Sequence, residues 1–225
     1  FAGLTVDAGG TLTLVDDGTG AEDLTVYNDG FDYGFLTVNG TFILANQAAV
    51  AGTDGINAVF NAGSIYRHQY TTSEGSIPIA FWDENSTVII EGYTANINAT
   101  VNGNWNQTFG NVVFNCAGLG NNFIQLNGLL TTIQNDLTVS ATGNTGGSLR
   151  FATTQNPTII IGRDLIVSGT ARMLVATGTN TVVNIGRDFL YSSSNTSGTN
   201  LTTTGNTSVN VGRNLQLNAN GGRLV

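Results

Sequence analysis

Three arginines recur at the same position of a repeated pattern in the second half of the chain. The arginines are Arg163, Arg187 and Arg213, and the residues that directly follow them are Asp164, Asp188 and Asn214. Stacked guanidinium groups suit bidentate contact with carboxylates, so one interpretation is a binding track for an anionic glycan or a carboxylated polymer. The interpretation that we favour is a ladder of Arg–Asp pairs between successive repeats, each contributing about 0–1 kcal/mol if exposed.

Carboxylates gather in a glycine-rich segment near the start of the chain. The candidate ligands for a hard cation are Asp16, Asp17, Glu22 and Asp23. Calcium prefers oxygen ligands of this kind, so a calcium site is one interpretation. The spacing differs from that of an EF-hand loop, and the glycine-rich nonapeptides of calcium-binding β-rolls are missing from the sequence. A solvated acidic turn that needs no cofactor is therefore the interpretation that we favour.

Large aromatic residues cluster in the middle of the chain. The candidates for an exposed surface that stacks on sugar rings are Trp82, Trp105, Tyr66, Tyr70 and Tyr93. Aromatic rings also fill protein cores and stack on one another. The sequence thus leaves two interpretations, a glycan-binding surface and internal packing, and it favours packing.

Residues for catalysis are sparse. His68 is the single histidine, and no Gly-x-Ser-x-Gly segment marks a nucleophilic serine. Asp83, Glu84 and Glu91 could supply a carboxylate pair, so a polysaccharide lyase or hydrolase is the alternative with the least support. We predict a non-catalytic protein in which His68 lies on the surface. Cys116 lies in an alternating stretch, and we expect it to be a small buried apolar residue.

Composition excludes several functional classes. The chain has 7 basic residues, none of them lysine, against 15 acidic residues, for a net charge of −8 and a pI of about 4.2. This charge disfavours binding to a phosphate backbone, so we expect no nucleic-acid partner. No apolar run reaches the ~20 residues needed to cross a bilayer, so we expect no membrane insertion. One cysteine cannot form a disulfide within the chain or a zinc cluster.

The segments that must position these residues resemble short β-strands. Stretches rich in Leu, Val, Ile and Thr alternate with Gly, Asn and Asp, and apolar residues do not recur at helical spacing. Similar segments surround Asp136, Asp164, Asp188 and Asn214, at steps of 28, 24 and 26 residues. A period of this length favours a solenoid, in which each repeat buries its apolar face only by stacking on the next.

We therefore predict an all-β fold, a right-handed parallel β-helix with coils of about 24–28 residues. An antiparallel β-sandwich is the alternative, since it also has short strands and regular turns. The predicted inward-facing columns are Leu137, Leu165, Phe189 and Leu215, and beside them Val139, Val167, Tyr191 and Leu217.

We expect one continuous solenoid over residues 1–225, with residues 55–115 as its least regular part. Strand-like sequence starts at the first residues and continues to the last ones. We therefore expect the chain to be a piece of a longer protein.

Several segments together resemble a known class of protein. They are Ala58–Tyr66, Ile77–Trp82, Ser86–Gly92 and Gln107–Cys116, followed by the repeated Asn-Asp-Leu-Thr-Val type of coil. This pattern resembles the β-helical repeat regions of large secreted cell-surface proteins of Bacteroidota, many of which are adhesins or gliding-associated proteins exported by the type 9 secretion system. The resemblance covers nearly the whole chain, but it rests on the general low-complexity pattern of the repeats.

The resemblance implies a structural stalk or surface segment at the extracellular face of a bacterial cell. The expected partners are other segments of the same large chain, secretion or surface-anchoring machinery, and cell-surface or environmental glycans. A glycan-binding module that uses the surface aromatics or the arginine ladder is the first alternative, and a polysaccharide-degrading β-helix is the second.

Overall fold

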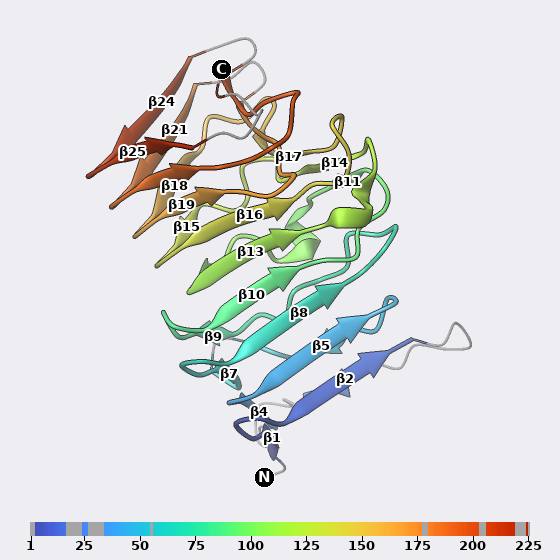
Figure 1. Ribbon diagram of the computed structural model, residues 1–225. Coiled ribbons are helices and arrows are strands. Elements are labelled where there is room, and N and C mark those ends of the chain that lie inside the picture. The colour runs from blue at the N-terminus through green and yellow to red at the C-terminus, as the bar shows by residue number, and fades with distance from the viewer. Residues whose placement is uncertain are drawn as a thin grey trace.

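The computed structural model describes residues 3–16, 24–26, 34–54, 56–176, 180–202, 206–218 and 224. These residues form an all-β solenoid in which parallel strands stack from one end of the chain to the other (Figure 1). They contain no α-helix, only two single-turn 3₁₀ helices at Val101–Gly103 and Ala117–Leu119. The prediction of a parallel β-helix is confirmed.

The antiparallel sandwich is wrong, because every strand pairing among the described residues is parallel. One nine-stranded sheet runs the length of the molecule. Its strands are β2 (Thr11–Val15), β5 (Thr41–Ala45), β8 (Ile65–Gln69), β10 (Thr87–Ile90), β13 (Asn111–Asn115), β16 (Leu137–Ala141), β19 (Leu165–Val167), β22 (Phe189–Tyr191) and β25 (Leu215–Leu217).

The strand that precedes each of these in the chain belongs to a second face of the solenoid, which is divided into two sheets. The four-stranded sheet holds β1 (Gly3–Val6), β4 (Phe35–Val38), β7 (Ala58–Phe60) and β9 (Phe81–Trp82). The β12 sheet holds β12 (Thr108–Phe109), β15 (Thr132–Ile133), β18 (Thr158–Ile161), β21 (Thr181–Ile185) and β24 (Thr207–Val211).

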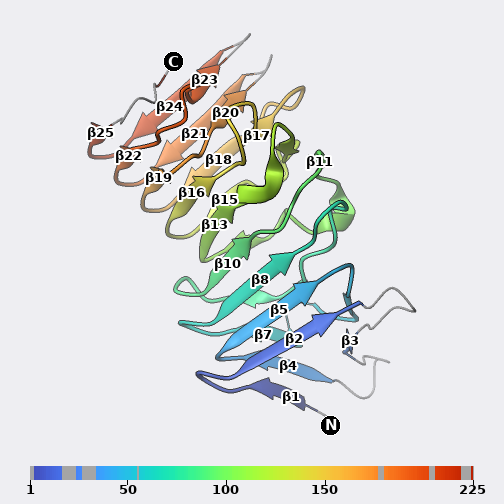
Figure 2. The same ribbon diagram turned by 45° about the vertical axis from the view of Figure 1, so that its right-hand side comes forward.

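The third face follows the nine-stranded sheet along the chain and is visible in the turned view of Figure 2. The β11 sheet holds β11 (Ile97–Asn98), β14 (Phe123–Gln125), β17 (Ser148–Ala152), β20 (Met173–Ala176) and β23 (Asn200–Thr202). A two-stranded sheet of β3 (Leu24–Thr25) and β6 (Val50–Ala51) precedes it. Three strands per coil is thus the common arrangement, which the sequence period alone did not reveal.

Alternation along the strands places apolar side chains inside. Leu137, Leu165, Phe189 and Leu215 pair in register, as do Val139, Val167, Tyr191 and Leu217. Parallel in-register pairing puts equivalent residues on the same side of the sheet, so each set forms a column. All are buried except Leu215 and Leu217, which are exposed because no described strand pairs with the outer edge of β25.

The corner between the β12 sheet and the nine-stranded sheet is too tight for a side chain at one position. A Cβ atom added to Gly186 would overlap the carbonyl oxygen of Gly162, and one added to Gly212 would overlap that of Gly186. The backbone amides continue the stacking here, since Gly186 N donates to Ile161 O at 2.8 Å. Close approach of successive coils, and not a positive φ, therefore explains the glycine before each arginine.

Large aromatic side chains fill the coils in the middle of the solenoid. Phe60 and Trp82 stack with ring centroids 4.1 Å apart, and Trp105 stacks on Phe114 at 6.2 Å. Between β8 and β9 the chain forms no strand of the third face. The four-stranded sheet ends at β9 and the β12 sheet begins one coil later, so the regular pairing of the second face is interrupted inside residues 55–115.

Candidate functional site

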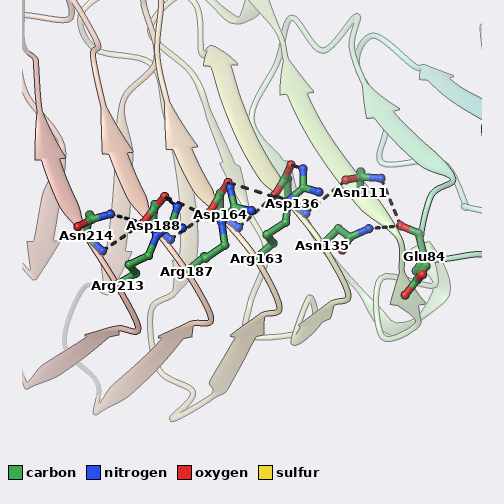
Figure 3. Close-up of polar contacts among 10 residues, drawn as sticks. All are labelled: Glu84, Asn111, Asn135, Asp136, Arg163, Asp164, Arg187, Asp188, Arg213 and Asn214. Carbon is green, nitrogen blue, oxygen red and sulfur yellow. Dashed lines mark hydrogen bonds and ion pairs between the residues drawn. The ribbon is translucent and has the colours of Figure 1, made fainter.

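The predicted arginine ladder lies along the corner before the nine-stranded sheet (Figure 3). Each arginine reaches the aspartate of the preceding coil. Arg187 Nη2 donates to Asp164 Oδ2 at 2.8 Å, and Arg213 Nε donates to Asp188 Oδ1 at 2.9 Å. Arg163 binds Asp136 in the same way, through Nε at 2.8 Å and through Nη2.

The aspartates also bind the backbone of the following coil. Asp164 Oδ1 accepts from Asp188 N at 3.1 Å, and Asp188 Oδ1 accepts from Asn214 N at 3.1 Å. One carboxylate thus joins two coils through a side chain and through the main chain. Towards the N-terminus the ladder continues without arginine, since Asp136 N donates to Asn111 Oδ1 at 3.3 Å.

The electrostatics of the ladder are those of paired charges. The hydrogen bond from Arg213 lowers the pKa of Asp188 to about 2, with further contributions from Asn214. The same pairing raises the pKa of Arg213, and Asp136 raises that of Arg163. Three arginines face three aspartates, so the charge of the ladder sums to zero. Arg163, Arg187 and Arg213 hence lie where the sequence placed them, and they form the pairs that we favoured.

The proposed aromatic surface is wrong. Trp82, Trp105, Tyr66, Tyr70 and Tyr93 are all buried in the core, at most 3% exposed. Tyr66 and Trp82 occupy inward positions of β8 and β9, and their rings are 5.8 Å apart in an edge arrangement. Side chains without an exposed face cannot stack on an external sugar, so these five residues serve packing.

The surface position expected for His68 is also wrong, because the residue occupies an inward position of β8 and is buried. Its Nε2 lies 2.8 Å from the carbonyl oxygen of Glu74, which can only accept, so Nε2 carries the proton. Nδ1 then accepts from the Tyr66 hydroxyl at 2.8 Å. Burial lowers the pKa of His68 to about 4, so the ring is neutral near pH 7.

Glu74 ties several coils together around this histidine. Its carbonyl oxygen accepts from the Tyr93 hydroxyl at 2.6 Å. Its carboxylate accepts from Trp105 Nε1 at 2.6 Å and from Thr100 N at 2.7 Å. The network replaces the missing strand of the third face, and every polar atom named in it has a partner within the protein.

The acidic residues proposed for catalysis do not converge on His68. Glu91 Oε1 accepts from Arg67 Nη1 at 2.7 Å and from Gln69 Nε2 at 2.8 Å. Asp83 Oδ1 accepts from Asn85 N at 2.8 Å in its own turn, and Glu84 is exposed. Cys116 is buried as expected, and burial raises the pKa of its thiol to about 12.

Most of the proposed calcium ligands, Asp17, Glu22 and Asp23, lie outside the described residues. Asp16 is described, and its backbone amide donates to Ala45 O at 3.4 Å. Elsewhere in the described ranges, no three His, Cys, Asp or Glu side chains gather where a metal ion could be held. The calcium site therefore stays a prediction about the acidic segment.

Two surface features were not predicted from the sequence. Phe81 is exposed beside a depression of about 300 Å³ at the interruption of the second face, where Gln107 Oε1 accepts from Ala80 N at 2.9 Å. A larger groove of about 520 Å³ crosses the loops between the nine-stranded sheet and the β11 sheet. It is lined by Asn121, Asn144, Thr145, Thr170, Ser194 and Asn195. Loop residues carry no periodic signal that would have marked either feature.

Among the described residues, no helix has the length and apolar character needed to span a membrane. Comparison of the chain with known proteins gave no matching family model, no matching curated protein and no matching solved structure.

Proposed function

We propose that this chain is a non-catalytic structural segment, a stalk or surface element, of a large extracellular cell-surface protein of the adhesin type. The observation that carries the proposal is the unbroken nine-stranded sheet, along which every coil contacts the next through backbone pairing. Solenoids gain stability from nearest-neighbour interfaces, so such a body can be extended without a single central core. This architecture is best suited to an extended rod that provides length and surface area.

The arrangement of polar groups supports the same role. The ladder residues Asp164 and Asp188 bind the neighbouring coil through their carboxylates. The buried ring of His68 binds the Glu74 carbonyl oxygen, and the carboxylate of the half-buried Glu74 accepts from Trp105. Catalytic sites instead keep titratable groups directed at a cleft. The resemblance to Bacteroidota surface proteins adds the expected setting, with type 9 secretion or surface-anchoring machinery and further segments of the same chain as partners.

Two measurements on the natural full-length protein test this proposal. An antibody against this segment should label intact cells as strongly as permeabilised ones, and the purified chain should leave a panel of neutral and acidic polysaccharides undegraded. Labelling that requires permeabilisation would overturn the extracellular assignment. Depolymerisation of any polysaccharide by the purified chain would overturn the non-catalytic assignment.

A further inference from the structure

The second face of the solenoid, formed by the four-stranded sheet and the β12 sheet, has an uncharged outer surface. None of its described strands contains an acidic or a basic residue. Away from β1, β2 and β25 at the two ends, the exposed large apolar side chains among the described residues lie on this face or in the loops that lead to it. They are Phe35, Ile56, Ile79, Phe81, Val101 and Ile160. Several such side chains on one face indicate an interaction site.

The depression of about 300 Å³ lies on this face, where β9 and β12 of adjacent coils do not pair. Two glutamine side chains take the place of the missing backbone hydrogen bonds. Gln107 Oε1 accepts from Ala80 N at 2.9 Å, and Gln134 Nε2 donates to Trp82 O at 3.1 Å. These side chains fix the spacing of the two coils, so the depression is a defined feature of the folded chain.

Phe81 supplies an exposed aromatic ring at this depression. Its side chain is 55% exposed, whereas Trp82, the next residue of β9, is 2% exposed. Successive residues of a strand point to opposite sides of the sheet, so Trp82 packs inside and Phe81 faces outwards. Ile79 is also exposed and lines the depression. An aromatic ring and an aliphatic side chain therefore form an apolar surface that a ligand can reach.

Uncharged polar groups lie beside this apolar surface. Thr108 and Gln134 line the depression, and both are exposed. The Thr108 hydroxyl and Gln134 Oε1 form no hydrogen bond with any described residue, so both can bind a ligand. Among the described residues that line the depression, none is charged. An ionic ligand would find no opposite charge here, whereas a neutral ligand with hydroxyl groups would find hydrogen-bonding partners.

We propose that this depression binds a neutral polysaccharide, with one sugar ring stacked on Phe81 and its hydroxyls bound to Thr108 and Gln134. A pyranose ring has an apolar face of CH groups and a rim of hydroxyls, which matches an aromatic ring beside uncharged polar groups. The volume is at the lower end of the range of small-ligand sites, which suits a sugar residue. The site adds a ligand to the proposed structural role and does not depend on it.

Isothermal titration of the full chain tests the site with neutral hexasaccharides of glucose, mannose, xylose and N-acetylglucosamine, and with a galacturonate hexamer as the acidic counterpart. We expect at least one neutral hexasaccharide to bind, and to bind more tightly than the galacturonate. Phe81→Ala and Phe81→Leu should each weaken that binding about three- to tenfold, because both remove the ring. Phe81→Tyr keeps the ring and should retain the affinity. Phe35→Ala is the matched control, since it removes an exposed ring of the same sheet outside the depression, and it should leave the affinity unchanged.

Nuclear magnetic resonance of the two tryptophan indoles keeps the test valid if a Phe81 variant unfolds. Trp82 lines the depression and its Nε1 donates to Gln107 Oε1 at 3.0 Å, whereas Trp105 Nε1 donates to Glu74. The bound hexasaccharide should shift the Trp82 indole resonance more than that of Trp105. Equal shifts, or equal weakening by Phe35→Ala and Phe81→Ala, would overturn the site. No binding of any neutral hexasaccharide, or galacturonate bound as tightly, would overturn the neutral ligand.

A second copy of the chain is the competing occupant of this face. Sedimentation at the concentrations of the titration distinguishes the two, and we expect the natural chain to be a monomer. A dimer that Phe81→Ala converts to a monomer would overturn the proposal, because the face would then be an interface between copies.

Discussion

Asp188 is the residue at which the arginine ladder can be tested by pH. Its pKa in the folded protein is lowered to about 2 from an ordinary value of 3.8, first by the hydrogen bond from Arg213. A lowered carboxyl pKa gives a stabilising contribution that is present above about pH 4 and lost as the pH falls towards 2. We expect Asp188→Asn to be less stable than the natural chain at pH 7 and to show a flatter loss of stability in this window.

Urea unfolding between pH 2 and pH 7 would measure this difference. Glu84→Gln, on the exposed turn at the end of the ladder, is the matched control and should follow the natural profile. If the free energy of unfolding falls with pH in the same way for Asp188→Asn and the natural chain, the stabilising role of the ladder is contradicted.

His68 gives a second pH signature, in a different window. The folded protein holds its pKa at about 4 against 6.5 in the unfolded chain, because the ring is buried. The unfolded chain therefore takes up the proton first, and stability present above pH 6.5 is lost as the pH falls to about 4. The shift corresponds to about 3 kcal/mol. The groups that face the ring are Tyr66, Tyr70, Tyr93, Trp105 and the Glu74 carbonyl.

His68→Gln removes the titration and keeps an amide that can donate to the Glu74 carbonyl. Thermal melting between pH 4 and pH 7 should show a smaller drop for this variant than for the natural chain. The same drop in both proteins would show that His68 does not titrate within the core.

At the scale of elements, the tight corner at Gly162, Gly186 and Gly212 determines whether successive coils can stack. In Gly186→Ala the new methyl group would overlap the Gly162 carbonyl, which belongs to the backbone of the neighbouring coil and cannot move away freely. We expect a loss of about 1–3 kcal/mol or more in the free energy of unfolding. Gly3→Ala is the matched control, because its Cβ would lie 3.9 Å from Phe35 and meet nothing closer. Similar melting temperatures for the two variants would contradict a sterically closed corner.

The sequence predicted the elements that repeat and missed those that do not. The steps between Asp136, Asp164, Asp188 and Asn214 gave the parallel register of the ladder and both core columns, because stacked coils must repeat the same contacts. The aromatics of residues 66–105 have no such repeat, so composition alone could not tell an inward Trp105 from an exposed one.

At the scale of the whole molecule, a solenoid should accept an additional coil. Residues 164–187 are one period of 24 residues, and repeating them after Arg187 restores the Gly-Arg-Asp corner at both junctions. We expect a folded chain that is longer by about 4.8 Å, the spacing of adjacent strands. Cooperative melting and small-angle X-ray scattering would measure this outcome. Repeating only residues 164–185 omits the corner and should disrupt folding; equal tolerance of both insertions would contradict the stacking register.

The measurement that tests the proposed structural role most directly is cryo-EM of the natural protein on intact cells. We expect residues 1–225 to appear as a rod with strands about 4.8 Å apart along its axis, with the ladder arginines on its outside and Trp82 and Trp105 inside. A compact domain with these tryptophans facing a solvent-filled cleft would contradict the account and return a discrete binding or catalytic site to first place.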